Sequence, residues 1–154
     1  MKSMTLQQVV DRIEIDDLLT RYATAVDTQD WALYASCFTP DAFIDYSAAG
    51  GIKGHLPEVK AWIAHVIPVF PMTQHVVCNR AVTLNGDTAT ARSCFFNPMG
   101  LPDEDGGRVL FFDGGYYNDK LVRTPDGWRI AERIEETSYS TRLHRIAEKG
   151  ELGL

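Results

Sequence analysis

Cysteine is scarce in this sequence, and its spacing fits neither a disulfide framework nor a metal site. Three cysteines, Cys37, Cys78 and Cys94, are scattered among the 154 residues, and no two of them form a Cys-x-x-Cys pair. Each lies in an apolar run, so we predict three reduced, buried thiols. The 4 histidines have no ligand spacing, and the acidic run at 103–105 lacks the EF-hand pattern. We therefore expect no bound metal.

Motifs for nucleotides, serine nucleophiles, nucleic acids and membranes are missing as well. The sequence has no glycine-rich phosphate loop and no Gly-x-Ser-x-Gly elbow. Its net charge of −6 disfavours a nucleic-acid binder. No run approaches the roughly 18 apolar residues of a membrane span, and charged sequence begins by Asp11, without the apolar core of a signal peptide. We expect a cytoplasmic protein with no cofactor and with neither nucleic acid nor membrane as a partner.

The composition is that of an ordinary globular domain, and its first third predicts helices. A hydrophobic fraction of 45% and a length of 154 residues indicate one domain over residues 1–154. Apolar residues recur at intervals of three and four in the opening segment, with Leu6, Val9 and Ile13 on the expected buried face. Three helices are predicted: Thr5–Val26 with Thr5 as N-cap, Trp31–Cys37 with Asp30 as N-cap, and one that starts after Leu56 with Pro57 in its first turn.

The remainder of the chain predicts long antiparallel strands. Residues 71–98 form two arms rich in β-branched and aromatic residues around Asn85-Gly86, a strong hairpin signal. In the second arm, every other residue from Ala89 to Asn97 is expected on one face. The other expected elements are a strand over Ala42–Tyr46, a polar mobile loop over Met99–Arg108, strands over Val109–Arg123 (bulged at Gly114-Gly115) and Trp128–Ser140, and a short helix from Thr141 to Gly150.

One histidine is placed differently from the others. His75 lies near the start of the first hairpin arm, in a strand-like run, whereas the other histidines fall in loop- or helix-like segments. An imidazole can take up and return a proton near neutral pH. We therefore expect the chain to build a pocket around His75 and to supply it with an acidic partner.

The order of elements resembles a known family. Helix, helix, short strand, helix and four long strands, the last beginning Asp-Gly-Trp-Arg-Ile at 126–130, is similar to the SnoaL-like branch of the nuclear-transport-factor-2-like superfamily. The resemblance extends from Ile15-Asp16-Asp17-Leu18 to Ile130-Ala131-Glu132-Arg133. It implies an α+β fold in which a curved, mostly antiparallel sheet wraps around the N-terminal helices as a cone with a deep pocket. The fold hosts enzymes and non-enzymes alike.

Within that branch the spacing is most similar to the lyases: scytalone dehydratase, the bile acid dehydratases and hexachlorocyclohexane dehydrochlorinase. The resemblance implies a dyad of Asp27, just after the first helix, and His75, with the carboxylate orienting the imidazole as general base. It implies that Tyr22 hydrogen-bonds a carbonyl or protonates a leaving hydroxyl, and that an inward Arg133 stabilises an enolate or a departing anion. Tyr46, Asn97, Asp45 and Phe95 are the expected substrate contacts.

Each of these residues also has a simpler interpretation. Asp27 resembles a solvated turn residue, and a lone strand histidine is commonly a hydrogen-bonded core residue. Tyr22 lies on the apolar face of its helix and fits the core. Arg133 belongs to a strand that also carries Arg129 and Glu132, a pattern typical of an exposed charged ladder.

The function that these residues suggest is a cofactor-independent lyase of the dehydratase type, or an isomerase of the same chemistry. Its substrate would be a hydrophobic cyclic small molecule that is steroid-, polyketide- or aromatic-like. Two alternatives remain open: a polyketide cyclase that uses Asp27 as its main base, and a non-catalytic module, either a ligand-binding protein or the small subunit of a ring-hydroxylating dioxygenase. Relatives cover an exposed sheet face by assembling, so we expect a homo-oligomer, a trimer or a dimer.

Overall fold

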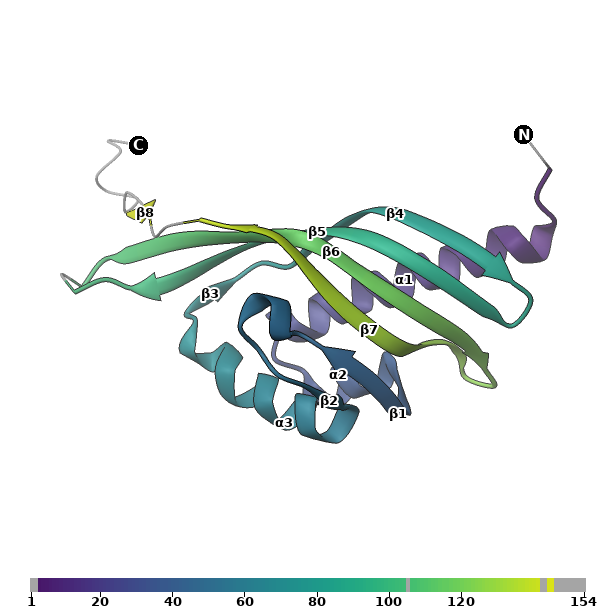
Figure 1. Ribbon diagram of the computed structural model, residues 1–154, viewed down its shortest axis with the longest axis horizontal. Coiled ribbons are helices and arrows are strands. Elements are labelled where there is room, and N and C mark those ends of the chain that lie inside the picture. Colours follow the sequence, from purple (N-terminus) through teal and green to yellow (C-terminus); the bar gives the residue numbers. More distant parts are fainter. Residues whose placement is uncertain (1–2, 105, 142–143, 146–154) are drawn as a thin grey trace.

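The computed structural model describes residues 3–104, 106–141 and 144–145. The helices lie beneath one arched sheet, and the strands of the second half of the chain form most of that arch (Figure 1). The elements in chain order are α1 (Leu6–Asp27), α2 (Trp31–Ser36), β1 (Phe38–Asp45), the short helix η1 (Ser47–Ala49), β2 (Lys53–His55), α3 (Leu56–Val66), η2 (Ile67–Val69), β3 (Met72–Thr73), β4 (Val76–Asn85), β5 (Thr88–Pro102), β6 (Arg108–Thr124), β7 (Gly127–Ser140) and β8 (His144–Arg145).

The opening helix begins where its capping residue predicts. The Thr5 side chain accepts a hydrogen bond from the backbone of Gln8, whose own side chain accepts one from the Thr5 backbone, which is a capping box. From Ile15 onward the apolar stripe of α1 is buried. The prediction was wrong for the first turns, because Leu6, Val9 and Ile13 are exposed. That end of α1 extends past the other helices, so no second layer covers it (Figure 1).

The sheet has the predicted antiparallel character with one exception. Its strand order is β2-β1-β7-β6-β5-β3, while β4 pairs with β5 and β8 with β6. Strand β1 runs parallel to β7, and every other described pair is antiparallel. The curved, mostly antiparallel sheet over N-terminal helices that the sequence predicts is thereby confirmed. Alternate residues of β5 from Ala89 to Asn97 face the helices and are buried, also as predicted.

Two segments of the hairpin region differ from the prediction. His75 lies between β3 and β4 rather than inside a strand. Met99 to Pro102 continue β5, and β6 begins at Arg108, because the register runs unbroken from Asn97↔Asp113 to Pro102↔Arg108. The expected loop is therefore confined to residues 103–107, and Met99 belongs to an extended hairpin arm.

Smaller departures occur at both ends of the sheet. Strand β1 begins at Phe38, so Pro40 lies within it, at a stretch where the pairing with β7 is irregular and a missing N–H is tolerated. A register shift between Gly114 and Gly115 confirms the predicted bulge in β6. The expected C-terminal helix was wrong at 144–145, which form β8 against β6. Its residues 142–143 and 146–150 lie outside the described residues.

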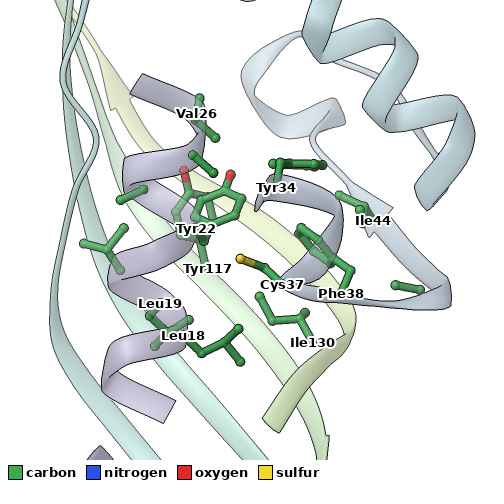
Figure 2. Packing of buried hydrophobic residues seen from close by; sticks show 14 of the residues in the cluster. Leu18, Leu19, Tyr22, Val26, Tyr34, Cys37, Phe38, Ile44, Tyr117 and Ile130 are labelled. Atoms are coloured by element: carbon green, nitrogen blue, oxygen red, sulfur yellow. The ribbon is translucent and has the colours of Figure 1, made fainter. Parts of the chain in front are cut away.

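The hydrophobic core fills the space between α1, α2, β1 and the inner face of the sheet. Figure 2 shows Leu19 and Tyr22 of α1 facing Tyr117 of β6 and Ile130 of β7. All three cysteines are free; Cys37 is buried, whereas Cys78 and Cys94 are only half-buried, contrary to the prediction. Among the helices of the described segments, none combines the length and the apolar character needed to cross a bilayer.

Candidate active site

Asp27 and His75 meet at the end of α1. Asp27 is the last residue of the helix, and His75 follows β3. The Asp27 Oδ1 atom lies 2.6 Å from His75 Nδ1, and Oδ2 accepts a second hydrogen bond, 2.8 Å long, from the His75 backbone N–H. The carboxylate therefore holds both the main chain and the ring of the same residue. This double contact sets the orientation of the imidazole.

The two hydrogen bonds also keep Asp27 charged. Burial alone would raise the pKa of its carboxyl, but the hydrogen bonds from the His75 ring and backbone lower that pKa below its ordinary value. A carboxylate is only an acceptor, so His75 Nδ1 carries the hydrogen, and in the neutral ring the lone pair is on Nε2. The His75 side chain is only 8% exposed, and it lines the adjacent cavity.

A cavity of about 220 Å³ opens beside His75, between α1, α3 and the sheet. Its walls are largely aromatic, with the rings of Trp62, Phe70 and Phe111 joined by tyrosines. The polar groups are few and come from several elements. The aromatic and polar lining residues are Tyr22, Tyr46, Trp62, Phe70, Phe111, Tyr117, His75, Asn97, Asp113 and Glu135. Such a cavity suits a ring-shaped, mostly apolar ligand with a few polar substituents.

Three tyrosines form a hydrogen-bonded chain at the inner end of the cavity. The Tyr46 hydroxyl lies 2.9 Å from that of Tyr22 and 3.2 Å from that of Tyr34. Burial raises the pKa of all three phenols, so they are neutral donors. Two contacts use two of the three O–H groups. With Tyr34 as the first donor and Tyr46 as the second, the Tyr22 O–H stays free to donate to a ligand in the cavity that Tyr22 lines.

Asn97 places an unused acceptor on the cavity wall. Its side chain comes from the inner face of β5, and its Nδ2 donates to the Tyr117 hydroxyl at 3.5 Å. The residue is 5% exposed, and its Oδ1 has no hydrogen-bond partner among the described residues. A buried amide oxygen without a partner is costly. A ligand hydroxyl would satisfy it.

Arg133 points inward but does not reach the cavity surface. Its guanidinium makes two hydrogen bonds to Asp119, of 2.7 and 2.8 Å, and both side chains are fully buried. Burial alone would lower the pKa of Arg133, but the Asp119 carboxylate raises it well above its ordinary value. The guanidinium carbon lies 3.9 Å from the Tyr22 ring centroid and 4.3 Å from that of Tyr117. Arg133 therefore contacts the back of the tyrosines that line the cavity.

Two other expected substrate contacts lie outside the cavity lining. The Asp45 carboxylate accepts hydrogen bonds from the backbone and hydroxyl of Ser47. Phe95 is buried behind the wall, where it stacks on Tyr117 with the ring centroids 4.6 Å apart. Of the expected substrate contacts, Tyr46 and Asn97 line the cavity.

Sequence reasoning missed two carboxyl groups in the cavity wall, Asp113 and Glu135. Glu135 follows Arg133 on the inner face of β7 and pairs in register with Tyr117 of β6. Burial, together with the Asp113 and Asp45 carboxylates, raises the pKa of Glu135 to about 7, although Arg133 opposes this effect. Strict alternation from Trp128 would place Glu135 outward. The pairing shifts between Ile130 and Glu132, and the shift turns Arg133 and Glu135 inward.

No cluster of three or more His, Cys, Asp or Glu side chains suited to a metal occurs within residues 3–104, 106–141 and 144–145. The cavity carboxyls Asp113 and Glu135 lack a third ligand of this kind. The polar groups that line the cavity are an imidazole, tyrosine hydroxyls, an amide and two carboxyls.

Comparison with known proteins relates this geometry to a family. The sequence profile of the SnoaL-like domain matches residues 7–134. An uncharacterised protein of Mycobacterium tuberculosis is 44% identical over 136 residues, which are 88% of this chain and 91% of that protein.

Solved structures have the same fold at lower identity. A candidate scytalone dehydratase of Novosphingobium aromaticivorans superposes with a TM-score of 0.80 at 21% identity, covering 92% of this chain and 93% of that one. A hexachlorocyclohexane dehydrochlorinase superposes with a TM-score of 0.76 at 19% identity, covering 92% and 93%. At such identities the likeness concerns the fold alone.

Proposed function

We propose that this chain, which belongs to the SnoaL-like domain family, is a cofactor-independent lyase that eliminates water from a hydrophobic cyclic β-hydroxyketone. The observation that carries the proposal is the 2.6 Å contact between Asp27 and His75 at the wall of an aromatic cavity. The likeness in fold to a candidate scytalone dehydratase and a dehydrochlorinase, two proteins named for eliminations, supports the same class of chemistry.

The first step is removal of a proton from the carbon next to the ketone. His75 Nε2 accepts this proton, and the Asp27 carboxylate stabilises the imidazolium that results. The electrons of the broken C–H bond form an enolate, whose oxygen accepts a hydrogen bond from the Tyr22 hydroxyl at the end of the tyrosine chain. The enolate then expels the β-substituent. General base catalysis of this kind contributes about 10² to 10⁴ in rate.

The role that we propose for Arg133 differs from the direct stabilisation of an enolate or departing anion that the resemblance suggests. It contacts the rings of Tyr22 and Tyr117 and is paired with Asp119, so it positions the tyrosines rather than the substrate. A positive charge behind the Tyr22 ring makes its O–H a stronger hydrogen-bond donor. Replacement of Arg133 would therefore act through Tyr22.

The lining supports an uncharged substrate. Among the residues that line the cavity, the described ones include Asp113 and Glu135 but no lysine or arginine that would pair with an anion. Trp62, Phe70 and Phe111 offer broad apolar surfaces for fused rings. We favour a bicyclic or polycyclic ketone, of the steroid-, polyketide- or aromatic-like kind, over a sugar or a carboxylic acid.

The proposal predicts that His75→Ala and Asp27→Asn remove the elimination activity. In an assay with a bicyclic β-hydroxyketone that follows enone or phenol formation, we expect kcat/KM to fall by about 10² or more in both variants. Circular dichroism spectra serve as the check of folding. If both variants are folded and keep wild-type turnover, the dyad is not the catalyst. Loss of activity in Asp27→Asn alone would instead favour the cyclase alternative, in which an aspartate is the base.

We further propose a cytoplasmic homo-oligomer. Large apolar side chains are exposed at two places, on the first turns of α1 (Leu6, Ile13) and on the sheet (Phe96, Tyr139). Exposed apolar groups of this kind support burial against another copy. Sedimentation velocity of the purified chain tests the assembly, and a single species with the mass of one chain would contradict it.

A further inference from the structure

Elimination of water needs a proton donor as well as a base. Hydroxide is a poor leaving group, and the reaction becomes easy when an acid protonates the departing oxygen. The resemblance suggested Arg133 for the stabilisation of the departing anion. That guanidinium is buried against Asp119 and the tyrosine rings, and it does not line the cavity. The donor must come from another residue.

Glu135 is placed for this task. It lines the same cavity as His75 but comes from a different part of the sheet: His75 follows β3, and Glu135 is on β7, which β6 and β5 separate from β3. No hydrogen bond or ion pair occupies the Glu135 carboxyl within the described part of the chain. The nearest cation along its strand, Arg133, is already paired with Asp119. Its neighbour Glu136 faces outward and pairs with Arg92.

The groups around Glu135 favour its protonated form. Burial is the largest influence and raises its pKa. The carboxylates of Asp113 on β6 and Asp45 on β1 act in the same direction, while Arg133 opposes them. With a pKa of about 7, a substantial fraction of the molecules carries an uncharged carboxylic acid at neutral pH.

The phenols beside it are weaker acids. Tyr117 is the register partner of Glu135, and Tyr22 on α1 lines the same cavity. Burial raises the pKa of each phenol, and the Glu135 carboxylate adds to that effect. These tyrosines can donate hydrogen bonds but hold their protons tightly. With its pKa of about 7, Glu135 gives up a proton near neutral pH more readily than these phenols do.

We propose that Glu135 is the general acid of this site and protonates the leaving hydroxyl of the β-hydroxyketone. This inference rests on the proposed function. His75 Nε2 takes the α-proton, and the C–H electrons form the enolate that Tyr22 hydrogen-bonds. As the enolate returns to the ketone, its electrons form the carbon–carbon double bond, and the C–O bond breaks as its oxygen receives the Glu135 proton. The products are an enone and water. Transfer of the His75 proton to Glu135, directly or through solvent, restores the starting state.

Two substrates that differ only in the leaving group test the assignment. β-Hydroxytetralone needs an acid for its hydroxyl to leave, whereas the acetate of β-acetoxytetralone leaves without one, and both need the same base. We expect Glu135→Gln to lower kcat/KM for the hydroxy compound by about 10² and to change that for the acetoxy compound less than about threefold. Glu136→Gln, the matched outward control, should change neither.

The pH profile gives a second reading. For the wild type, kcat/KM for the hydroxy compound should fall as the pH rises through about 7, and this fall should be absent for the acetoxy compound and in Glu135→Gln. If Glu135→Gln lowers kcat/KM equally for both substrates, or for neither of them, Glu135 is not the general acid. If His75→Ala leaves both reactions intact, or the wild type eliminates neither substrate, the proposed function fails and the assignment fails with it.

Discussion

At the scale of single residues, the site depends on which carboxyl has a partner. Asp27 stands at the C-terminal end of α1, where the helix dipole disfavours a negative charge by up to about 1 kcal/mol. Two hydrogen bonds from His75 offset this cost and keep it ionised. Among the residues that the structure describes, Glu135 has no such partner, and burial raises its pKa to about 7. The two carboxyls are suited to opposite roles because their hydrogen bonds differ.

The raised pKa of Glu135 has a consequence for stability. Its pKa is about 7 in the folded protein and 4.5 in the unfolded chain, so the folded state is favoured most below pH 4.5 and loses stability as the pH rises through about 7. Glu135→Gln removes this loss. We expect the variant to gain about 1–3 kcal/mol relative to the wild type between about pH 4.5 and pH 8.5, after allowance for partial solvent exposure.

Urea unfolding at the two pH values measures this difference. Glu136→Gln is the control, since that carboxylate is exposed and paired with Arg92. If the difference in unfolding free energy between Glu135→Gln and the wild type is the same at both pH values, the pKa of Glu135 is not raised.

At the scale of elements, the irregular pairing of β6 with β7 decides which side chains face the cavity. One register shift lies between Lys120 and Leu121, opposite the stretch that turns Arg133 inward, and another lies at Gly114-Gly115. At Gly115 the two backbones approach so closely that a Cβ atom would overlap the Glu136 carbonyl oxygen. The glycine is thus required by the packing of the strands.

This close approach predicts a marked effect of a single methyl group. Gly115→Ala must push β7 away from β6, and we expect it to cost about 1–3 kcal/mol of unfolding free energy. It should also weaken the elimination, because Glu135 lies next to the displaced Glu136. Gly107→Ala is the matched control, since its nearest neighbour would be 4.0 Å away. Equal urea midpoints for the two variants would contradict the contact.

At the scale of the whole molecule, the cavity is an unfilled part of the core. It lies where α1, α3 and the sheet diverge, and its aromatic walls have no protein partner on one side. A ligand that binds only the folded state stabilises it by mass action, by about 2.7 kcal/mol at a concentration of 100 Kd. For a chain of this size, that corresponds to a rise in Tm of about 5–10 °C.

We therefore expect bicyclic ketones to raise the melting temperature and sugars of similar mass to leave it unchanged. Val66→Trp, on the α3 wall, should abolish the shift by filling the cavity. Differential scanning fluorimetry of the wild type and of Val66→Trp, each with and without ligand, measures the shift in melting temperature. A shift of equal size in Val66→Trp would place the ligand elsewhere.

Much of the architecture could be predicted because it depends on local patterns. The Thr5 cap, the Asp30 cap, the Asn85-Gly86 turn and the bulge at Gly114-Gly115 are all properties of a few adjacent residues, and the structure has each of them. The spacing of Asp27 and His75 anticipated their contact only through the resemblance to a family. Their meeting depends on the path of the chain between them.

What the sequence determined by itself is the three main helices, the long strands, their order and the alternation of β5, since hydrogen-bonding and apolar periodicity act over short distances. Tertiary structure alone decided the inward turn of Arg133 and Glu135, the pairing of Arg133 with Asp119, and the exposure of Leu6 and Ile13. A shift of one residue in strand register reverses the face of every later side chain. Such a shift depends on how two distant strands fit together, and burial and charge at the site follow from that fit.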